Sequence, residues 1–220
     1  MLRIKRFIFN PVGVNTYVLS DDSGTSALID CGCWSESEWD QLTHYLTTNG
    51  LHVTQLLNTH LHLDHVFGNQ FALRNMGLKP SASPYDYPLY KSLSSQVAMF
   101  FGEQVASSLD YSYTNAIGEG LSDGDILKIG KEELRVIWTP GHSPGGLCFY
   151  NSANKLLISG DTLFQMSIGR TDLPGGDYAT LIDSIKTKLY SLPPDTVVYP
   201  GHGEATTIEY EMHYNPYVGL

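Results

Sequence analysis

The sequence predicts an α/β fold, and three observations support this class. Short apolar stretches rich in β-branched and aromatic residues alternate with helix-like stretches in both halves of the chain. Glycine and proline separate these stretches, which is typical of turns between packed elements. No linker, internal repeat or low-complexity stretch interrupts the 220 residues, so we expect a single domain over residues 1–220.

The first part of the chain is expected to form strands around one helix. The helix is predicted over Glu36–Thr48 and ends at Asn49-Gly50, a pair that favours helix termination. Runs of β-branched and aromatic residues predict the strands. These strands are expected over Ile4–Phe9, Asn15–Leu19, Ser26–Ile29 and His52–Leu57.

The second part repeats this alternation. A helix is predicted over Tyr178–Tyr190, because Pro193-Pro194 follows and cannot continue it. The apolar runs on either side of this helix predict further strands. They are expected over Leu134–Trp138, Leu147–Tyr150, Lys155–Ile158 and Thr196–Tyr199.

The segment from Ser83 to Leu109 is predicted to be mostly helical and carries many large apolar side chains. Two interpretations are open for them: they pack in the core, or they form a lid that faces a substrate. Core packing is the favoured interpretation, because aromatic stripes are usually buried. The side chains are Tyr85, Tyr87, Tyr90, Met99, Phe100 and Phe101.

Composition excludes several classes of partner and location. With 13 Lys and Arg against 23 Asp and Glu, the net charge of -10 repels nucleic acids and anionic lipid surfaces. The three cysteines, Cys31, Cys33 and Cys148, do not form a disulfide framework, which fits a reducing compartment. The N-terminal stretch lacks the uninterrupted apolar run of a signal peptide, and no segment has the length of a membrane span. A cytoplasmic protein is therefore expected, with its oligomeric state left open.

One short motif holds the strongest chemical signal. Thr59 is followed by His60-Leu61-His62-Leu63-Asp64-His65, directly after a predicted strand. Imidazole and carboxylate groups are ligands of Zn²⁺ and similar metals. In extended chain His60 and His62 point to the same side, and a helix that begins near Asp64 would turn Asp64 and His65 back toward the same space. The motif can therefore serve two neighbouring metal ions.

Three further segments share one pattern, an apolar strand followed by a glycine-containing turn with one potential ligand. The ligands are His142 in RVIWTPGH, Asp161 in KLLISGD and His202 in TVVYPGH. Loops at one end of a sheet often gather binding groups. Five of the eight histidines fall in the four turns, which favours a metal site over unrelated surface or capping roles. The remaining three, His44, His52 and His213, are expected to be structural.

HLHLDH followed by ligands in TPGHSPGG, SGD and PGHG resembles the metallo-β-lactamase superfamily over nearly the whole chain. The resemblance implies an αββα four-layer sandwich, in which two mixed sheets are flanked by helices and two metals lie at one edge. His60, His62 and His142 would hold the first metal. Asp64, His65 and His202 would hold the second, and Asp161 would bridge the two.

Residues 160–177, GDTLFQMSIGRTDLPGGD, resemble the glyoxalase II branch more closely than the β-lactamases. The GRTD element also occurs in persulfide dioxygenases, but Ser167-Ile168 before Gly169 favours the hydrolases. Compared with full-length glyoxalase II, the chain is expected to lack the C-terminal helical domain that binds glutathione, and Gly203-Glu204 replaces the tyrosine expected after the last histidine motif. Arg170 stands where the longer enzymes carry a substrate-binding lysine.

The resemblance implies hydrolysis of small hydroxyacyl thioesters, such as S-lactoylglutathione, by a hydroxide that bridges two divalent ions. Metal coordination lowers the pKa of water to about 7, and Asp64 would orient the hydroxide and hold its proton. A thiolate leaves readily, since the pKa of a thiol is about 8.5, so no strong general acid is required. Nitrogen and oxygen ligands favour Zn²⁺, with Fe and Mn as alternatives.

Two other functions stay open. A mononuclear iron persulfide dioxygenase would use His60, His142 and Asp161 as a facial triad with open positions. A metal-stabilised partner module without turnover is disfavoured by the complete ligand set. Iron content and oxygen consumption would identify the dioxygenase.

Four residues near the motifs have two interpretations each. Asp30 is expected to support the metal site through hydrogen bonds rather than to act in catalysis. Cys31 and Cys33 are either reactive or buried and inert, and the second is commoner. Arg170 either binds substrate or forms an ion pair with a carboxylate such as Asp172.

Overall fold

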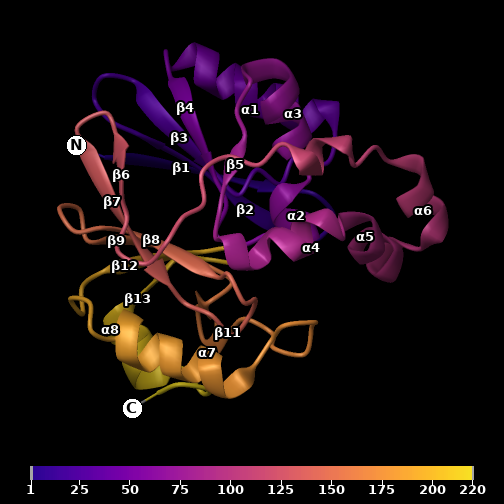
Figure 1. The fold of residues 1–220 in the computed structure, drawn as a ribbon. Helices are drawn as coiled ribbons and strands as arrows, with labels where there is room; N and C mark the ends of the chain where they lie inside the picture. The colour runs from indigo at the N-terminus through magenta and orange to yellow at the C-terminus, as the bar shows by residue number, and fades with distance from the viewer. Residues whose placement is uncertain (1, 220) are drawn as a thin grey trace.

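The computed structural model describes residues 2–219 and shows two β-sheets packed face to face, with helices on both outer sides (Figure 1). Helices α1 (Glu36–Thr48) and α3 (Asn69–Met76) cover the sheet of the N-terminal half. Helices α7 (Tyr178–Ser184) and α8 (Ile208–Tyr214) cover the sheet of the C-terminal half. This arrangement confirms the predicted four-layer sandwich of two mixed sheets flanked by helices.

The N-terminal half contains strands β1 to β5 and a helical arm. Its remaining elements are β1 (Arg3–Phe9), β2 (Val14–Ser20), β3 (Thr25–Ile29), β4 (His52–Leu57), α2 (Leu63–Val66), β5 (Pro80–Ser81), η1 (Pro84–Asp86), α4 (Tyr87–Lys91), α5 (Leu93–Phe101), α6 (Glu103–Ser108) and η2 (Ser112–Asn115).

The C-terminal half contains the other strands. Its remaining elements are β6 (Ile126–Ile129), β7 (Glu132–Trp138), β8 (Leu147–Asn151), β9 (Leu156–Gly160), β10 (Leu163–Phe164), β11 (Ser167–Ile168), the π-helical η3 (Ile185–Leu189), β12 (Val197–Pro200) and β13 (Thr206–Thr207).

Both large sheets mix parallel and antiparallel pairs. In the first, strands lie in the order β1-β2-β3-β4-β5, with β3, β4 and β5 parallel and the other neighbours antiparallel. In the second the order is β13-β12-β9-β8-β7-β6, and only β12 and β9 are parallel. The parallel neighbours β9 and β12 therefore end at the same edge, and both of their following turns reach the site.

Helix α1 shows how the sequence builds an outer layer. The Ser35 hydroxyl accepts a hydrogen bond from the backbone N–H of Glu38, and the Glu38 carboxylate accepts one from the N–H of Ser35, which closes a capping box. Trp39, Leu42 and Leu46 follow at helical spacing and are buried. They pack on the outer face of the first sheet, so the spacing that predicts the helix also fixes its buried side.

Apolar clusters join the layers. Between the sheets, Leu19 and Ile29 of the first sheet pack with Phe149 and Ile158 of the second, and all four are fully buried. Burial of one such side chain stabilises the fold by about 1.5–3 kcal/mol. The outer clusters include Val18, Leu28, Leu42 and Phe71 beside α1 and α3, and Cys148, Leu157, Leu181 and Ile185 beside α7.

The predicted elements are present, with most ends shifted by one or two residues. The helix over Glu36–Thr48 and the strand over His52–Leu57 have the predicted bounds. The helix predicted over Tyr178–Tyr190 changes to π-helical geometry at Ile185. Short strands such as β6 and the final helix α8 were not expected, because two to seven residues give little periodic signal.

Helices α5 and α6 form an arm that extends away from the sandwich (Figure 1). Core packing, the favoured interpretation for the apolar side chains of this segment, holds for Tyr90, which is 1% exposed. It is wrong for Tyr85, Met99 and Phe100, which are 63%, 67% and 45% exposed. Met99 and Phe100 lie on the arm, which extends away from the sandwich, so these side chains face solvent or the site.

Within residues 2–219, none of the helices combines the length and the apolar character that crossing a bilayer requires.

Candidate metal centre

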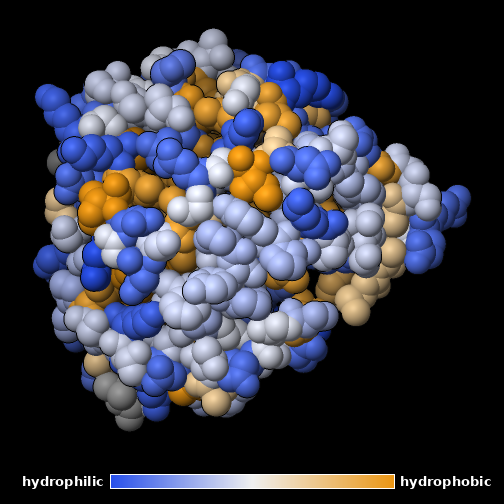
Figure 2. Space-filling view, viewed as in Figure 1, coloured by the Kyte–Doolittle hydropathy of each residue, from blue (hydrophilic) through white to orange (hydrophobic). Residues whose placement is uncertain are grey.

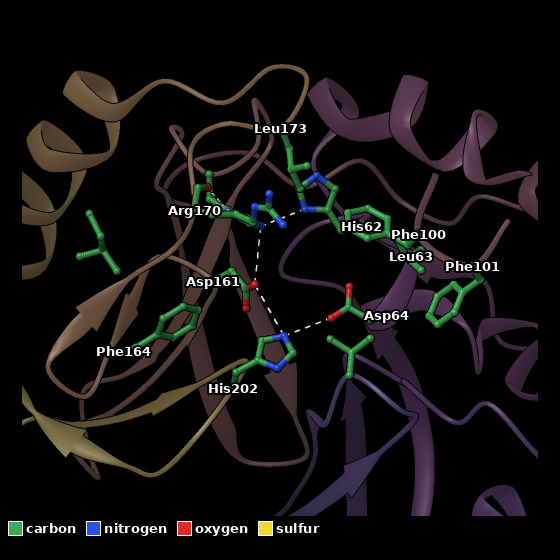
Figure 3. Close-up of a pocket in the computed structure, with 13 residues that line it drawn as sticks. His62, Leu63, Asp64, Phe100, Phe101, Asp161, Phe164, Arg170, Leu173 and His202 are labelled. Carbon is green, nitrogen blue, oxygen red and sulfur yellow. Dashed lines mark hydrogen bonds and ion pairs between the residues drawn. The ribbon is translucent and has the colours of Figure 1, made fainter. Parts of the chain in front are cut away.

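Four strand ends bring the sequence motifs to one place. His60 follows β4 of the first sheet, while His142, Asp161 and His202 follow β7, β9 and β12 of the second. The space between the sheet edges is therefore lined by loops from both sheets (Figure 3). Helix α2 begins at Leu63, as expected from the sequence, and carries Asp64 into the same space.

The first group of side chains consists of His60, His62 and His142, all buried. The Nε2 atom of His142 lies 2.9 Å from Nδ1 of His62 and 3.2 Å from Nε2 of His60. Two nitrogens bound tetrahedrally to one zinc ion, each at about 2.0–2.1 Å, lie about 3.3 Å apart. The spacing of these three nitrogens therefore fits a single metal ion.

The second group consists of Asp64, His65 and His202. Oδ2 of Asp64 lies 3.1 Å from Nε2 of His202 and 3.6 Å from Nε2 of His65. These are the residues that the family resemblance assigns to the second metal, and the first group contains those assigned to the first. The structure thus brings both sets together, and their role as ligands stays a prediction.

Asp161 lies between the two groups. Its Oδ1 atom is 3.3 Å from Nε2 of His65, and its Oδ2 atom is 3.6 Å from Nε2 of His142 and 3.7 Å from Nε2 of His202. Figure 3 shows the carboxylate pointing into the centre of the site. One carboxylate therefore faces residues of both groups.

Hydrogen bonds on the outer side of each ring hold the imidazoles in place. Nδ1 of His142 donates to the Arg170 carbonyl at 2.7 Å, and Nδ1 of His65 donates to Oδ2 of Asp30 at 3.0 Å. Nδ1 of His60 lies 3.1 Å from the hydroxyl of Thr59, whose hydrogen is donated to Asp30. When these rings are neutral, as metal binding requires, the proton sits on Nδ1 and Nε2 turns a lone pair toward the site.

This network tests whether the residues fit a metal. Nε2 of His60 and Nε2 of His142 face each other at 3.2 Å, and in the neutral rings neither carries a hydrogen to share. Nε2 of His65 and Oδ1 of Asp161 are buried and face each other at 3.3 Å, and neither has a hydrogen bond to any other described group. Buried polar atoms normally have partners, because leaving them unpaired is costly. A cation at each group would satisfy these atoms, so the residues fit divalent metals.

The pKa values of the buried histidines are shifted in opposite directions. Burial, followed by the neighbouring imidazoles, lowers the pKa of His60 well below its usual range and that of His62 to about 3. Burial also disfavours a charge on His65, but the carboxylates of Asp161, Asp64 and Asp30 outweigh it and raise its pKa. The first group is therefore neutral and rich in lone pairs, while His65 of the second group lies among three carboxylates that favour its charged form.

Asp30 supports the site as the sequence predicts. It ends β3 with a φ of 51° and is almost fully buried. One of its carboxylate oxygens accepts the backbone N–H of Thr59 at 2.7 Å, and the other lies beside the ring of His65. It orients ligand-bearing residues from behind and does not line the cavity.

Gly201 shows why glycine precedes the last histidine. Its N–H donates to the Gly160 carbonyl at 2.8 Å, which joins the turns after β12 and β9. A Cβ atom on Gly201 would overlap the Asp161 carboxylate and lie 2.7 Å from Cε1 of His65. Only glycine lets this backbone pass so close to the two side chains.

Two buried residues that stabilise the site escaped the sequence prediction. Asn15 donates from its side-chain amide to the carbonyls of Pro200 and Gly203, both at 2.9 Å, and so holds the loop of His202. Asp86 accepts hydrogen bonds from the loop that carries His142. Neither residue belongs to a ligand motif, so no local pattern singles them out.

The remaining predicted residues have mixed outcomes. Arg170 lines the cavity, and its guanidinium also forms two hydrogen bonds of 2.7 Å with Asp172, so both interpretations of its contacts apply. Cys31 and Cys33 are fully buried, with their sulfurs 4.0 Å apart, as the inert interpretation expects. His44, His52 and His213 are exposed and lie outside the groups described above.

Comparisons with known proteins agree with this geometry. The sequence model of the metallo-β-lactamase superfamily matches residues 9–202. A Haemophilus influenzae protein named hydroxyacylglutathione hydrolase GloC is 35% identical over 205 residues, which cover 93% of this chain and 92% of the relative.

Two crystal structures are similar over almost the whole chain. One is the BLEG-1 B3 metallo-β-lactamase, with a TM-score of 0.85 and 31% identity over 98% of this chain and 99% of that one. The other is the protein TTHA1623 in a di-iron-bound form, with a TM-score of 0.79 and 34% identity over 97% of this chain and 99% of that one. The chain therefore belongs to the metallo-β-lactamase superfamily, whose fold together with these histidine and aspartate clusters implies binding of divalent metal ions.

Proposed function

We propose that this metal-dependent hydrolase holds two divalent ions and cleaves small hydroxyacyl thioesters. His60, His62 and His142 would hold the first ion, Asp64, His65 and His202 would hold the second, and Asp161 would serve both. The observation that carries the proposal is the position of the Asp161 carboxylate, which lies within 3.7 Å of His142 in the first group and of His65 and His202 in the second.

The ions supply the chemistry that the side chains lack. When bound, they lower the pKa of a water molecule to about 7 and polarise the carbonyl oxygen of the substrate. The donors are nitrogen and oxygen atoms without thiolate, which favours Zn²⁺ and also suits Fe and Mn. The di-iron form of the similar protein TTHA1623 supports iron as a second choice.

The residues of the chain position the reactants and hold a proton. Asp64 lines the cavity and lies 3.1 Å from His202, so its carboxylate can accept the proton of the attacking water. The water oxygen bonds to the acyl carbon, the carbon–sulfur bond breaks, and the thiolate leaves with its electron pair. The products are the free acid and the thiol, which takes up one proton.

The lack of a strong acid favours a thioester over an amide or ester. Among the described residues that line the cavity there is no lysine, tyrosine or cysteine that could protonate an amine or alkoxide. A thiolate is a good leaving group, since the pKa of a thiol is about 8.5. The similarity to hydroxyacylglutathione hydrolase GloC supports the same substrate class.

The experiment that tests the proposal combines metal analysis with a substrate panel. Protein loaded separately with Zn²⁺, Fe²⁺ or Mn²⁺ is assayed with S-lactoylglutathione, a cephalosporin and a persulfide, following thiol release, ring opening and oxygen uptake. Thiol release from the thioester with about two ions per chain supports the proposal. Oxygen uptake with the persulfide and no thioester turnover would instead assign a mononuclear iron dioxygenase that uses His60, His142 and Asp161.

A further inference from the structure

The cavity above the metal centre is larger and more apolar than a hydroxyacyl group requires. Its volume is about 570 Å³, within the range of pockets for drug-sized ligands and several times the size of a three-carbon acyl group. If the acyl group occupies the floor beside His62, Asp64 and His202, most of the cavity is left for the thiol arm of the substrate.

One side of the cavity is a wall formed by Leu63, Phe100 and Phe101, here named the α5 wall. Figure 3 shows Leu63, Phe100 and Phe101 together on the side of Asp64. The space-filling view is indented between the α5–α6 arm and the half that carries α7, with hydrophobic atoms along its border (Figure 2). The α5 wall therefore offers an apolar surface next to the reacting groups.

The two phenylalanines of the α5 wall have different roles. Phe101 is partly buried and anchors the arm, with its ring 5.3 Å from that of Trp34 and 6.3 Å from that of Phe67. Phe100 is 45% exposed, and Val12, which also lines the cavity from the turn between β1 and β2, is 50% exposed. Apolar side chains exposed at the rim of a pocket mark a binding surface, because a ligand can remove them from water.

The charge of the cavity disfavours a thiol that carries free carboxylates. Arg170 is the one Lys or Arg among the described residues that line it. Its Nε and Nη2 atoms each donate to Asp172 at 2.7 Å, so the carboxylate of Asp172 already neutralises the guanidinium. The carboxylates of a glutathione arm would lose water at the apolar wall without a free cation to replace it.

We propose that the α5 wall binds the thiol arm of the substrate and selects an uncharged apolar thiol over glutathione. The inference rests on the proposed thioester hydrolysis and specifies its substrate class. Phe100 is the specificity-determining residue, because it is exposed at the rim yet lines the cavity. The reaction remains hydrolysis, in which the apolar thiol leaves as thiolate and takes up a proton in water.

The test compares two thioesters of one acyl group in the metal-loaded protein. The lactoyl thioester of benzyl thiol is expected to have a higher kcat/KM than S-lactoylglutathione. Phe100→Ser should lower kcat/KM for the benzyl thioester by about tenfold or more, mainly through KM, since it removes apolar contact area. The same variant should change kcat/KM for S-lactoylglutathione by less than about threefold.

Met99→Ser is the matched control. Met99 is the preceding residue on α5, is apolar and is 67% exposed, but it does not line the cavity. Its substitution should alter neither kcat/KM by more than about twofold. If Phe100→Ser affects both thioesters alike, or leaves both unchanged, the α5 wall does not select the thiol and the inference is wrong, although thioester hydrolysis stands.

A binding measurement separates this inference from the proposed function. Calorimetry with a non-hydrolysable benzyl thioether should show saturable binding to the wild type and to Met99→Ser, and at least about tenfold weaker binding to Phe100→Ser. Absence of turnover of both thioesters would overturn the proposed function, whatever the thioether does. Equal thioether binding by all three proteins would overturn the α5 wall as the apolar binding surface.

Discussion

The carboxylate of Asp86 accepts a hydrogen bond from the hydroxyl of Ser143 at 2.8 Å and so ties the turn before α4 to the loop of His142. It also accepts the backbone N–H of Gly145 at 2.6 Å and that of Leu61 at 3.3 Å. Leu61 lies between the first two histidines of the motif, so one buried carboxylate fixes both loops that supply the first group.

Asp86→Ala should weaken the first metal group and the fold together. It leaves a hydroxyl and two backbone N–H groups without their partner, which should lower the free energy of unfolding by about 2–4 kcal/mol. Metal affinity and thioester turnover should each fall at least about tenfold, because misplaced ligands bind poorly. Urea unfolding and competition with a chelator measure the two effects.

Ser143→Ala is the control for Asp86→Ala. It removes one hydrogen bond and should lower the free energy of unfolding by about 1 kcal/mol, with metal retained. Wild-type metal affinity in Asp86→Ala would show that the carboxylate does not position the loops.

Gly201→Ala should displace Asp161 and His65, because the added Cβ overlaps the carboxylate and lies 2.7 Å from the imidazole. The expected result is loss of at least one ion per chain and at least about a hundredfold lower activity. Gly203→Ala in the same loop is the matched control. Gly203 also has a positive φ, but its Cβ would meet no atom within 4 Å, so only backbone strain of about 1–2 kcal/mol is expected. Equal metal content in the two variants would show that the close approach of the Gly201 backbone to Asp161 and His65 is not the reason for glycine at this position.

Asp161→Ala should cost more activity than His202→Ala. Asp161 faces both groups, whereas His202 contacts Asp64 and Asp161 from one side and is 26% exposed. Loss of the bridging carboxylate should empty or separate the pair of ions, while loss of His202 should weaken only the second. Metal analysis and kcat/KM of both variants measure this order. Equal residual activity with equal metal content would show that Asp161 does not bridge.

Removal of metal should lower the melting temperature. The clustered imidazole nitrogens and carboxylate oxygens would bind ions only in the folded protein, so the ions would stabilise the native state. At a free metal concentration about 1,000 times Kd, the gain is about 4.1 kcal/mol for one site. Thermal unfolding before and after chelation, with elemental analysis of the loaded protein, should show this loss and about two ions per chain. One ion per chain, unchanged in Asp64→Ala and His202→Ala, would refute the dinuclear site.

Asp172→Ala should improve the use of anionic thioesters by freeing Arg170. The guanidinium is held by two hydrogen bonds to Asp172, which leave it without a free charge for the substrate. KM for S-lactoylglutathione should fall about two- to fivefold in Asp172→Ala at constant kcat, whereas Arg170→Ala should change it by less than about twofold. Steady-state kinetics at low salt tests both. No change in Asp172→Ala would mean that Arg170 does not meet the substrate.

The sequence by itself determined the alternation of strands and helices and the residues that meet at the metal centre, while the four layers were implied by the family resemblance. Local signals placed α1 and β4 at their observed bounds, because helix-ending residues and runs of β-branched residues act over a few positions of the chain. The ligand motifs could be recognised in the sequence for the same reason, because each holds its histidine or aspartate directly after a predicted strand. Asp30 was also placed correctly, since it ends a strand beside the first motif.

Tertiary structure decided what surrounds those ligands. The contact of Asp86 with Ser143 spans 57 residues, and that of Asn15 with Pro200 spans 185, so neither follows from any repeat or spacing along the chain. Tyr90 and Phe100 occupy one apolar stripe, yet the first is buried against the body of the protein and the second lies at the rim of the cavity. Burial of such a side chain depends on which distant elements pack beside it, and a linear pattern records only that the side chain is apolar.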